Sequence, residues 1–152
     1  MSPAALPPQN RNPDMLHPDA RMAWLRLAEA ALNLGRPIFL TEGYRTGARQ
    51  DALYAQGRTT PGKIVTHARA GQSWHQTGRA VDFAFAHGSP FAAEHPWEHI
   101  GQMGELLGFE WGGRWRKPDR PHLQFTGGLS LAEAIAEAKL DPRYRSKAPA
   151  GG

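Results

Sequence analysis

The hydrophobic residues of the chain fall into short runs separated by turn residues, and the first pattern is helical. Four positions near the N-terminus recur at helical spacing: Met22, Leu25, Ala28 or Glu29, and Leu32. Pro18 and Asp19 suit the first turn of a helix, and Gly35 is a natural terminator. We therefore expect a scaffold helix from about Pro18 to Gly35.

Three further helices are expected from their start and stop residues. Thr46 can cap a helix over residues 47–56, and proline can begin another over residues 96–107. A Ser-x-x-Glu capping box at residues 130–133 should start the last helix, which runs to about residue 140.

The remaining apolar runs are short and resemble strands. They span residues 38–41, 80–85, 109–111 and 122–125. Because strands and helices do not alternate regularly, we expect an α+β fold with a small, mostly antiparallel sheet flanked by helices. The intervening segment 58–71 is rich in turn residues and should form a long, structured loop of the kind that often carries function.

The length of 152 residues fits a single domain. Residues 1–13 contain four prolines and are expected to be a flexible lead, residues 14–145 form the one folded domain, and residues 146–152 are expected to be a flexible tail. No apolar run is long enough to cross a bilayer, so no membrane insertion is expected. The N-terminus lacks the basic start and apolar core of a secretory signal.

Composition narrows the possible chemistry. The chain has no cysteine, which excludes disulfides and thiolate zinc sites, so a metal would have to bind His, Asp or Glu. The net charge of +4 favours polyanions such as nucleic acid, anionic lipid or an acidic wall polymer, without choosing among them. No nucleic-acid-binding motif is recognisable, so no nucleic-acid partner is expected.

Two polar clusters beside strand-like runs carry the candidate chemistry. His75 and Asp82 stand seven residues apart across Gly78, and Asp119 and His122 follow about forty positions later. Two histidines and one aspartate could fill three corners of a tetrahedral zinc site and leave the fourth for water, while the other aspartate moves protons.

The other histidines have weaker claims to a site. His17 precedes a helix and suits a cap or a surface position, and His67 could line a cleft. His95 and His99 are four apart, but Pro96 makes His95 a cap and removes the His-Glu-x-x-His zincin pattern.

These clusters, together with several other motifs, resemble a family of bacterial cell-wall zinc peptidases. The resemblance lies in Ser73-x-His75-x-x-Gly78-x-Ala80-x-Asp82, Asp119-x-Pro121-His122, Glu42-Gly43-Tyr44-Arg45-Thr46, Gln50-x-x-Leu53-Tyr54-x-Gln56-Gly57-Arg58 and Trp111-Gly112-Gly113. The family comprises VanY-like D-alanyl-D-alanine carboxypeptidases, D-Ala-D-Ala dipeptidases and L-alanyl-D-glutamate endopeptidases, and its metal core is shared with hedgehog domains. The likeness covers about residues 36–126 and is greatest to the endopeptidase branch of phage endolysins and autolysins.

The resemblance implies roles for individual residues. One zinc ion would be bound by His75, Asp82 and His122. Asp119 would be the general base, and Arg45 would stabilise the oxyanion or orient the substrate; the alternative for Arg45 is a surface salt bridge. Four residues are expected at the substrate: Ser73, Trp74, Trp115 and Gln50. Ser73 could equally cap its turn.

Aromatic and basic residues beside these motifs leave alternatives open. Trp111 could wall a cleft with Trp74 and Trp115, or pack in the core. The basic residues of segment 114–120 could attract the carboxylates of a stem peptide or remain solvated.

The resemblance thus predicts a zinc peptidase that hydrolyses peptidoglycan stem peptides, as an L-alanyl-D-glutamate endopeptidase. Alternatives are a D-alanyl-D-alanine carboxypeptidase of the same fold and a non-catalytic zinc module that binds the wall. A monomer is expected. Without an export signal, the protein would be made in the cytoplasm and reach the wall after release, as endolysins do.

Overall fold

The computed structural model describes residues 6–145 and contains four α-helices, three short 3₁₀ turns and one four-stranded sheet. The helices are α1 (Pro18–Asn33), α2 (Gly47–Ala55), α3 (Trp97–Leu106) and α4 (Leu131–Leu140). The strands are β1 (Ile38–Glu42), β2 (Ala80–Phe85), β3 (Glu110–Trp111) and β4 (His122–Gln124). The 3₁₀ turns are η1 (Pro13–Met15), η2 (Trp74–Thr77) and η3 (Gly112–Arg114).

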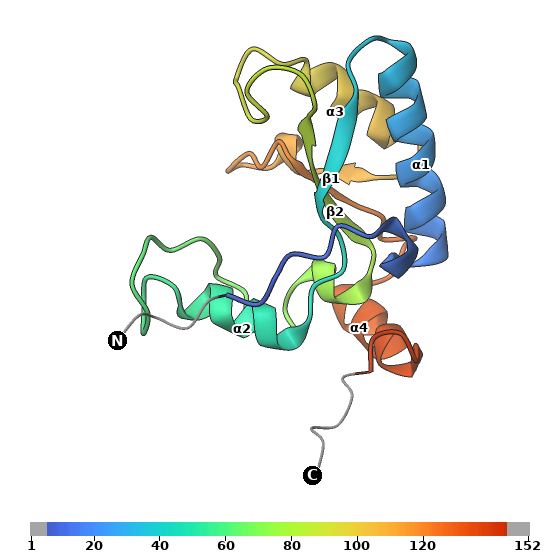
Figure 1. The fold of residues 1–152 in the computed structure, drawn as a ribbon. Helices are drawn as coiled ribbons and strands as arrows, with labels where there is room; N and C mark the ends of the chain where they lie inside the picture. Colours follow the sequence, from blue (N-terminus) through green and yellow to red (C-terminus); the bar gives the residue numbers. More distant parts are fainter. Residues whose placement is uncertain (1–5, 146–152) are drawn as a thin grey trace.

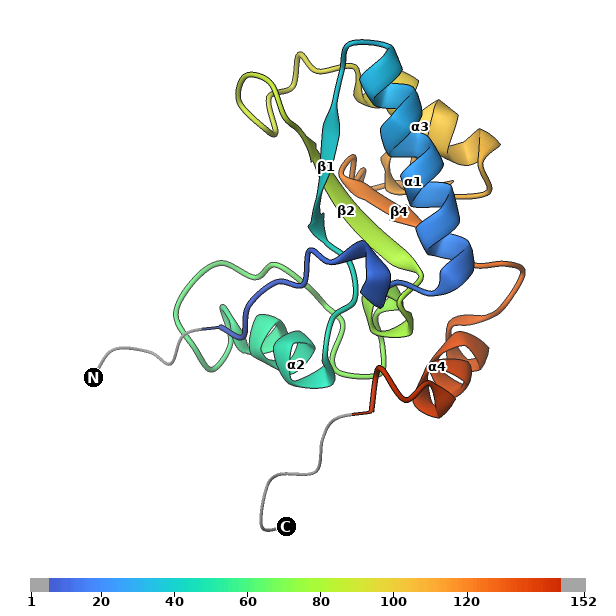
Figure 2. The ribbon, with the colours of Figure 1, turned by 45° about the vertical axis from the view of Figure 1, so that its right-hand side comes forward.

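The sheet is antiparallel throughout, with the strand order β1-β2-β4-β3. Helices α1 and α3 lie on the same side of it, while α2 and α4 lie below (Figures 1 and 2). This arrangement confirms the predicted α+β class, and each predicted helix and strand forms within a few residues of its expected bounds. Within residues 6–145, none of the helices combines the length and apolar character needed to span a bilayer.

Side chains of β2 alternate between the two faces of the sheet. Val81, Phe83 and Phe85 are buried in the core, where Phe83 packs against Trp24 of α1 and Trp97 of α3. Because successive strand residues point to opposite faces, Asp82 must face away from these helices. The core therefore presents Asp82 on the side of the sheet that α1 and α3 leave uncovered.

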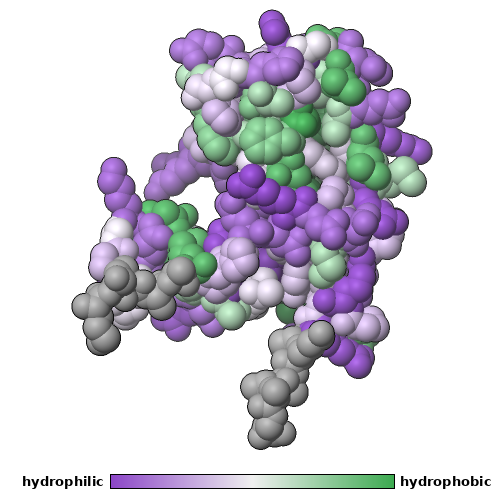
Figure 3. All heavy atoms as spheres, viewed as in Figure 1, coloured by the Kyte–Doolittle hydropathy of each residue, from purple (hydrophilic) through white to green (hydrophobic). Residues whose placement is uncertain are grey.

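The periodic residues that predicted α1 do not form its buried face. Met22, Leu25 and Leu32 are 54%, 49% and 62% exposed, and apolar surface is visible over α1 in Figure 3. The buried face consists of Ala20, Ala23, Trp24, Leu27 and Ala31. These residues also follow helical spacing, and the small alanines allow the helix to approach the sheet closely, which an assignment based on the largest side chains overlooks.

The segment before α1 is held against the domain over the part that the structure describes. Gly43 N–H donates to the Asn10 carbonyl at 2.8 Å, and the Arg49 guanidinium donates to the Pro7 carbonyl at 2.6 Å. Residues 1–5 of the expected lead and the tail 146–152 lie outside the described residues.

A candidate metal centre on the open face of the sheet

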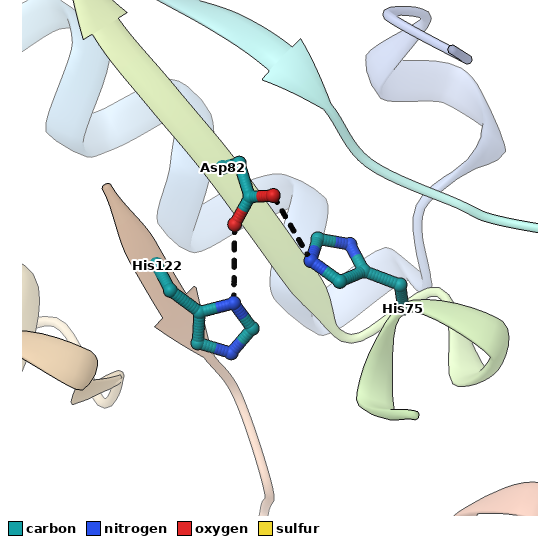
Figure 4. Close-up of side chains that lie close together, drawn as sticks. All are labelled: His75, Asp82 and His122. Atoms are coloured by element: carbon teal, nitrogen blue, oxygen red, sulfur yellow. Dashed lines mark hydrogen bonds and ion pairs between the residues drawn. The ribbon is translucent and has the colours of Figure 1, made fainter. Parts of the chain in front are cut away.

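His75, Asp82 and His122 come together on the uncovered face of the sheet (Figure 4). Asp82 lies in β2 directly opposite His122 of β4 in the antiparallel register, and His75 lies in η2 just before β2. Their candidate ligand atoms all lie within 4.8 Å of one another. In the described part of the chain, no other group of three His, Asp or Glu residues is arranged to hold a metal ion.

The backbone around η2 fixes the orientation of His75. Ser73 caps the turn by accepting a hydrogen bond from His75 N–H, and Gly78 ends it in the left-handed conformation at φ 72°. The imidazole Nδ1–H donates to the Gly43 carbonyl at 2.8 Å. Because a carbonyl only accepts, Nδ1 carries a proton, and Nε2 is the nitrogen that faces Asp82, whose Oδ2 is 3.3 Å away.

His122 is oriented by a side chain, and its ring presents the other nitrogen to Asp82. Its Nε2 lies 2.9 Å from the Gln124 amide oxygen, which accepts the Nε2–H, and its Nδ1 lies 3.1 Å from Asp82 Oδ1. His75 therefore offers Nε2 to the centre of the site and His122 offers Nδ1. The two carboxylate oxygens of Asp82 each face a different imidazole.

The charges in the site keep Asp82 ionised. Burial alone would raise the pKa of Asp82, but His75 and His122 hold it well below its usual range. Burial would lower the pKa of His122, yet the hydrogen bond and charge of Asp82 raise it. Two neutral imidazole nitrogens and one carboxylate oxygen are a donor set that suits zinc and leave a fourth position open, so these residues fit a catalytic zinc ion.

Asp119 sits at the rim of the site in the loop before β4. It is exposed, and its carboxyl group accepts no hydrogen bond from another residue of the described 6–145 range. Its backbone N–H donates to the Gly112 carbonyl at 2.9 Å, and its carbonyl accepts from His122 N–H at 3.2 Å. The partial removal of water around the carboxyl group raises the pKa of Asp119, and the charge of Asp82 adds to this.

Arg45 is anchored on one flank of Asp82. Its guanidinium donates to Glu42 at 2.6 Å and to Gln50 at 2.9 Å, and it lies 3.9 Å from Asp82 Oδ2. Its side chain is 11% exposed, so the ion pair that it forms is a buried one rather than the surface salt bridge considered as an alternative. The Arg45 Nε is buried without a hydrogen-bond partner among the described residues.

Gln50 does not reach the surface, although it was expected to contact substrate. It is 0% exposed, its amide oxygen accepts from Arg45, and its amide nitrogen donates to the Ala68 carbonyl at 2.6 Å. With both amide atoms engaged inside the protein, Gln50 supports Arg45 instead of offering hydrogen bonds to a ligand.

The tryptophans divide between the site and the core. The Trp115 ring is tilted over His122 with ring centroids 5.2 Å apart, and its residue is 36% exposed. Trp111 is 2% exposed and packs in the core, which decides between the two alternatives considered for it. Trp74 is half-buried in η2, next to His75.

The remaining histidines stay outside this site. His17 caps α1 by accepting from Asp19 N–H, as one of its two expected roles required. His95 lies against Phe85 and contacts the Ser89 carbonyl, and the exposed His67 contacts Arg58. No metal group forms from His95 and His99 within the described residues.

The supporting roles of three polar residues were not predicted from the sequence, although one of the three stands in a motif quoted above. The three are Glu42, Gln124 and Glu110. Glu42 is buried and binds both Arg45 and Arg49, and the two cations hold its pKa down although burial would raise it. The spacing His122-x-Gln124 on a strand places both side chains on one face and could have identified Gln124.

Comparisons with known proteins agree on one family. Residues 13–112 match the family model VanY, described as D-alanyl-D-alanine carboxypeptidase; this range contains His75 and Asp82 and ends before Asp119 and His122. The peptidoglycan L-alanyl-D-glutamate endopeptidase CwlK of Bacillus subtilis (strain 168) is 39% identical in an alignment of 124 residues, with a coverage of 74% of this chain and 74% of that protein.

Two solved structures support the same relationship. The L-Ala D-Glu endopeptidase ChiX of Serratia marcescens has a TM-score of 0.53 and 27% identity, covering 76% of this chain and 84% of its own. The LD-carboxypeptidase LdcB has a TM-score of 0.60 and 25% identity, covering 87% of this chain and 76% of its own.

Proposed function

The chain belongs to the VanY family of D-alanyl-D-alanine carboxypeptidases, and from this premise we propose that it is a zinc-dependent peptidase that hydrolyses peptidoglycan stem peptides between L-Ala and D-Glu. The observation that carries the proposal is the convergence of the His75, Asp82 and His122 ligand atoms, with one nitrogen of each imidazole held by Gly43 or Gln124 and the other facing Asp82.

Each residue of the site has a distinct task in this proposal. His75, Asp82 and His122 hold one zinc ion, which when bound supplies Lewis-acid chemistry by acidifying water and polarising a carbonyl. Asp119 accepts a proton from the attacking water and delivers it to the leaving amine. Its exposed carboxyl group, free of hydrogen bonds to other described residues, leaves it able to do so.

Arg45 contributes a fixed positive charge beside the reacting centre. Glu42 and Gln50 hold the guanidinium in place, so the charge needs no reorganisation when negative charge develops on the substrate. Gln50 thereby acts on the substrate through Arg45. Ser73 serves as the cap of the turn that carries His75. The Trp115 ring, tilted over His122, offers an apolar wall on which a peptide can lie, and Trp74 is proposed to contact the same peptide.

The choice of the L-Ala-D-Glu bond rests on the descriptions of two similar proteins. CwlK and ChiX are both described as L-Ala-D-Glu endopeptidases, and CwlK is similar over most of this chain. The description of the family model supports a second candidate, a D-alanyl-D-alanine carboxypeptidase with the same zinc site. The proposed substrate places the action of the protein at the cell wall, with the folded domain of residues 14–145 as a monomeric catalytic unit.

Two synthetic peptides separate these candidates. We expect hydrolysis of a peptide containing L-Ala-γ-D-Glu, with a new D-Glu amine, and no release of D-Ala from a peptide ending in D-Ala-D-Ala. Release of terminal D-Ala alone would favour the carboxypeptidase.

Purified protein should contain one zinc ion per chain, and His75→Ala should lose it, whereas the exposed His99→Ala should keep it. Equal zinc content in His75→Ala would remove His75 from the ligand set.

A further inference from the structure

Beyond His122, the hydrogen bonds continue through Gln124 to Glu110 and Trp115, and the chemistry proposed above gives Glu110 no role. Gln124 Nε2 donates to Glu110 Oε2 at 3.2 Å, and Trp115 Nε1 donates to Glu110 Oε1 at 3.1 Å. Glu110 and Gln124 are direct partners in the register of β3 and β4. The sequence of contacts is therefore His122, Gln124, Glu110 and Trp115.

Glu110 determines which group donates and which accepts in the hydrogen bonds that link Gln124 to Glu110 and to His122. A carboxylate only accepts, so Gln124 must turn its NH₂ group toward Glu110. The amide oxygen of Gln124 then faces His122 and can only accept, which places a proton on His122 Nε2. With Nε2 bonded to Gln124, Nδ1 is the nitrogen left to bind the metal, and it faces Asp82 Oδ1 at 3.1 Å.

The second carboxylate oxygen of Glu110 holds the Trp115 ring that lies over His122. It accepts the indole N–H of Trp115, whose ring lies 5.2 Å from the His122 ring at an angle of 45°. One carboxylate thus orients a metal ligand through Gln124 and places the ring that covers it.

The two histidines depend on different kinds of partner. The His75 Nδ1–H donates to a backbone carbonyl, which no side-chain substitution removes. His122 relies on Gln124, which is 6% exposed, and through it on the exposed Glu110. The metal affinity of the site should therefore be adjustable from β3 without any change to a ligand.

We propose that Glu110 and Gln124 are positioning residues that select the tautomer of His122 in which Nδ1 binds the metal, and that Glu110 also seats Trp115 over that ligand. The proposal deepens the function proposed above and rests on it for the identity of the metal. Outer partners of this kind typically change metal affinity by roughly 10–100-fold.

Three variants test the order of the hydrogen bonds. Gln124→Met keeps the volume of the side chain and removes the acceptor of His122. Glu110→Gln offers one acceptor to two donors, so Gln124 can rotate and present its NH₂ group to His122. The double variant Glu110→Gln with Gln124→Glu restores every donor and acceptor, because the new carboxylate accepts from both His122 and the new amide.

Two measurements are made on each variant: zinc affinity by competition with a chelator, and the ¹⁵N and ¹H signals of the His122 ring in the metal-free protein. Wild type and the double variant should show a slowly exchanging Nε2–H proton and similar zinc affinity. Gln124→Met and Glu110→Gln should lose the slow exchange and bind zinc roughly 10–100-fold more weakly. Glu94→Gln, the loss of an exposed carboxylate, is the matched control.

Two results would overturn the proposal. One is wild-type zinc affinity with a protected Nε2–H proton in Gln124→Met. The other is a loss in Glu110→Gln that the added Gln124→Glu does not recover, because Glu110 would then act through charge or packing alone. Since the proton signal is read without metal, a wild type that fails to bind zinc would refute the proposed function separately.

Discussion

At the scale of single residues, the two aspartates of the site differ in their surroundings and therefore in their tasks. Asp82 lies between two imidazoles that hold its pKa well below the usual range, so it stays ionised and can retain a cation. Asp119 is exposed and its pKa is raised, so it can exchange a proton closer to neutral pH. The difference supports Asp82 as a ligand and Asp119 as the general base.

Asp119→Asn tests this division of labour. The substitution keeps the size of the side chain and removes its ability to take a proton. We expect normal zinc content and a fall in kcat of roughly 10²–10⁴-fold, the usual contribution of general base catalysis. Metal analysis and peptide hydrolysis measure the two effects on the same sample. Full activity in this variant would exclude Asp119 as the base.

The raised pKa of Asp119 also predicts the pH dependence of the reaction. A general base works only when deprotonated, so kcat/KM should fall as the pH drops through the pKa of Asp119. Because the partial removal of water around the carboxyl group raises that pKa, the fall should begin at a higher pH than for an ordinary aspartate. Zinc occupancy measured at each pH separates this effect from loss of metal. The residual kcat/KM of Asp119→Asn should not show this fall at low pH. If the fall persists in the variant, it reports the titration of a group other than Asp119.

At the scale of secondary-structure elements, the site depends on how closely the turn after β3 approaches the start of β4. A Cβ added to Gly112 would lie 2.5 Å from the Asp119 carbonyl oxygen and 3.2 Å from the His122 Cβ. The first of these neighbours is backbone and cannot move cheaply. Gly112 is thus the residue that lets the base and a metal ligand occupy adjacent positions.

Gly112→Ala should therefore displace Asp119 and His122 together. We expect weaker zinc binding, slower hydrolysis and a loss of stability of about 1–3 kcal/mol, as for other overpacked positions. Gly47→Ala is the control, because its Cβ would meet its nearest neighbour, Gln76 Nε2, at an ordinary 3.5 Å. Unchanged zinc affinity and rate in Gly112→Ala, measured beside thermal unfolding, would contradict this role.

The elements themselves were largely predictable, because their start and stop residues are local. Thr46 accepts from Arg49 N–H as the expected cap of α2, and the capping box of Ser130 and Glu133 starts α4. The buried face of α1 was not predictable from the largest apolar residues, since packing selects the alanines that allow close approach. A turn capped by Ser73 was one of two alternatives and is what forms, but its 3₁₀ form was not predicted, because its hydrogen bonds depend on Ser73 and Gly78 together.

At the scale of the whole molecule, one charged cluster joins both ends of the described chain to the sheet. Arg79, the residue before β2, donates to Glu137 of α4 at 2.9 Å and lies 3.2 Å from His17, the cap of α1. Arg79 is 4% exposed, so its charge is compensated inside the fold. Burial and Arg79 lower the pKa of His17 below its ordinary value of 6.5, against the attraction of Glu137.

This cluster makes stability depend on pH in a definite direction. His17 stays neutral in the folded protein at a pH where it is protonated in the unfolded chain. The unfolded state therefore binds more protons as the pH falls from about 6.5 toward the lower folded pKa, and stability decreases over that range. His17→Asn keeps a side chain suited to capping and removes the titration. Denaturant unfolding should show that the free energy of unfolding decreases less on acidification in His17→Asn than in the wild type. An equal decrease in both proteins would contradict the assignment to His17.

The metal cluster could be found from sequence spacing and family resemblance, but its geometry could not. Strand register, which places Asp82 opposite His122, depends on the whole sheet. The orientation of each imidazole depends on partners as distant as Gly43. The sequence also could not show that Gln50 is buried. Gln50 stands in a family motif and was expected to contact the substrate, but it is 0% exposed and bonds to Arg45.

The central claim is that this protein cuts peptidoglycan stem peptides with a bound zinc ion. Its most direct test is digestion of purified peptidoglycan by the full chain, with and without a chelator, followed by mass analysis of the new termini. We predict new L-Ala carboxyl and D-Glu amino termini that disappear with the chelator and return when zinc is restored. Undigested peptidoglycan with the zinc-loaded protein, or unchanged digestion after the metal is removed, would contradict the account.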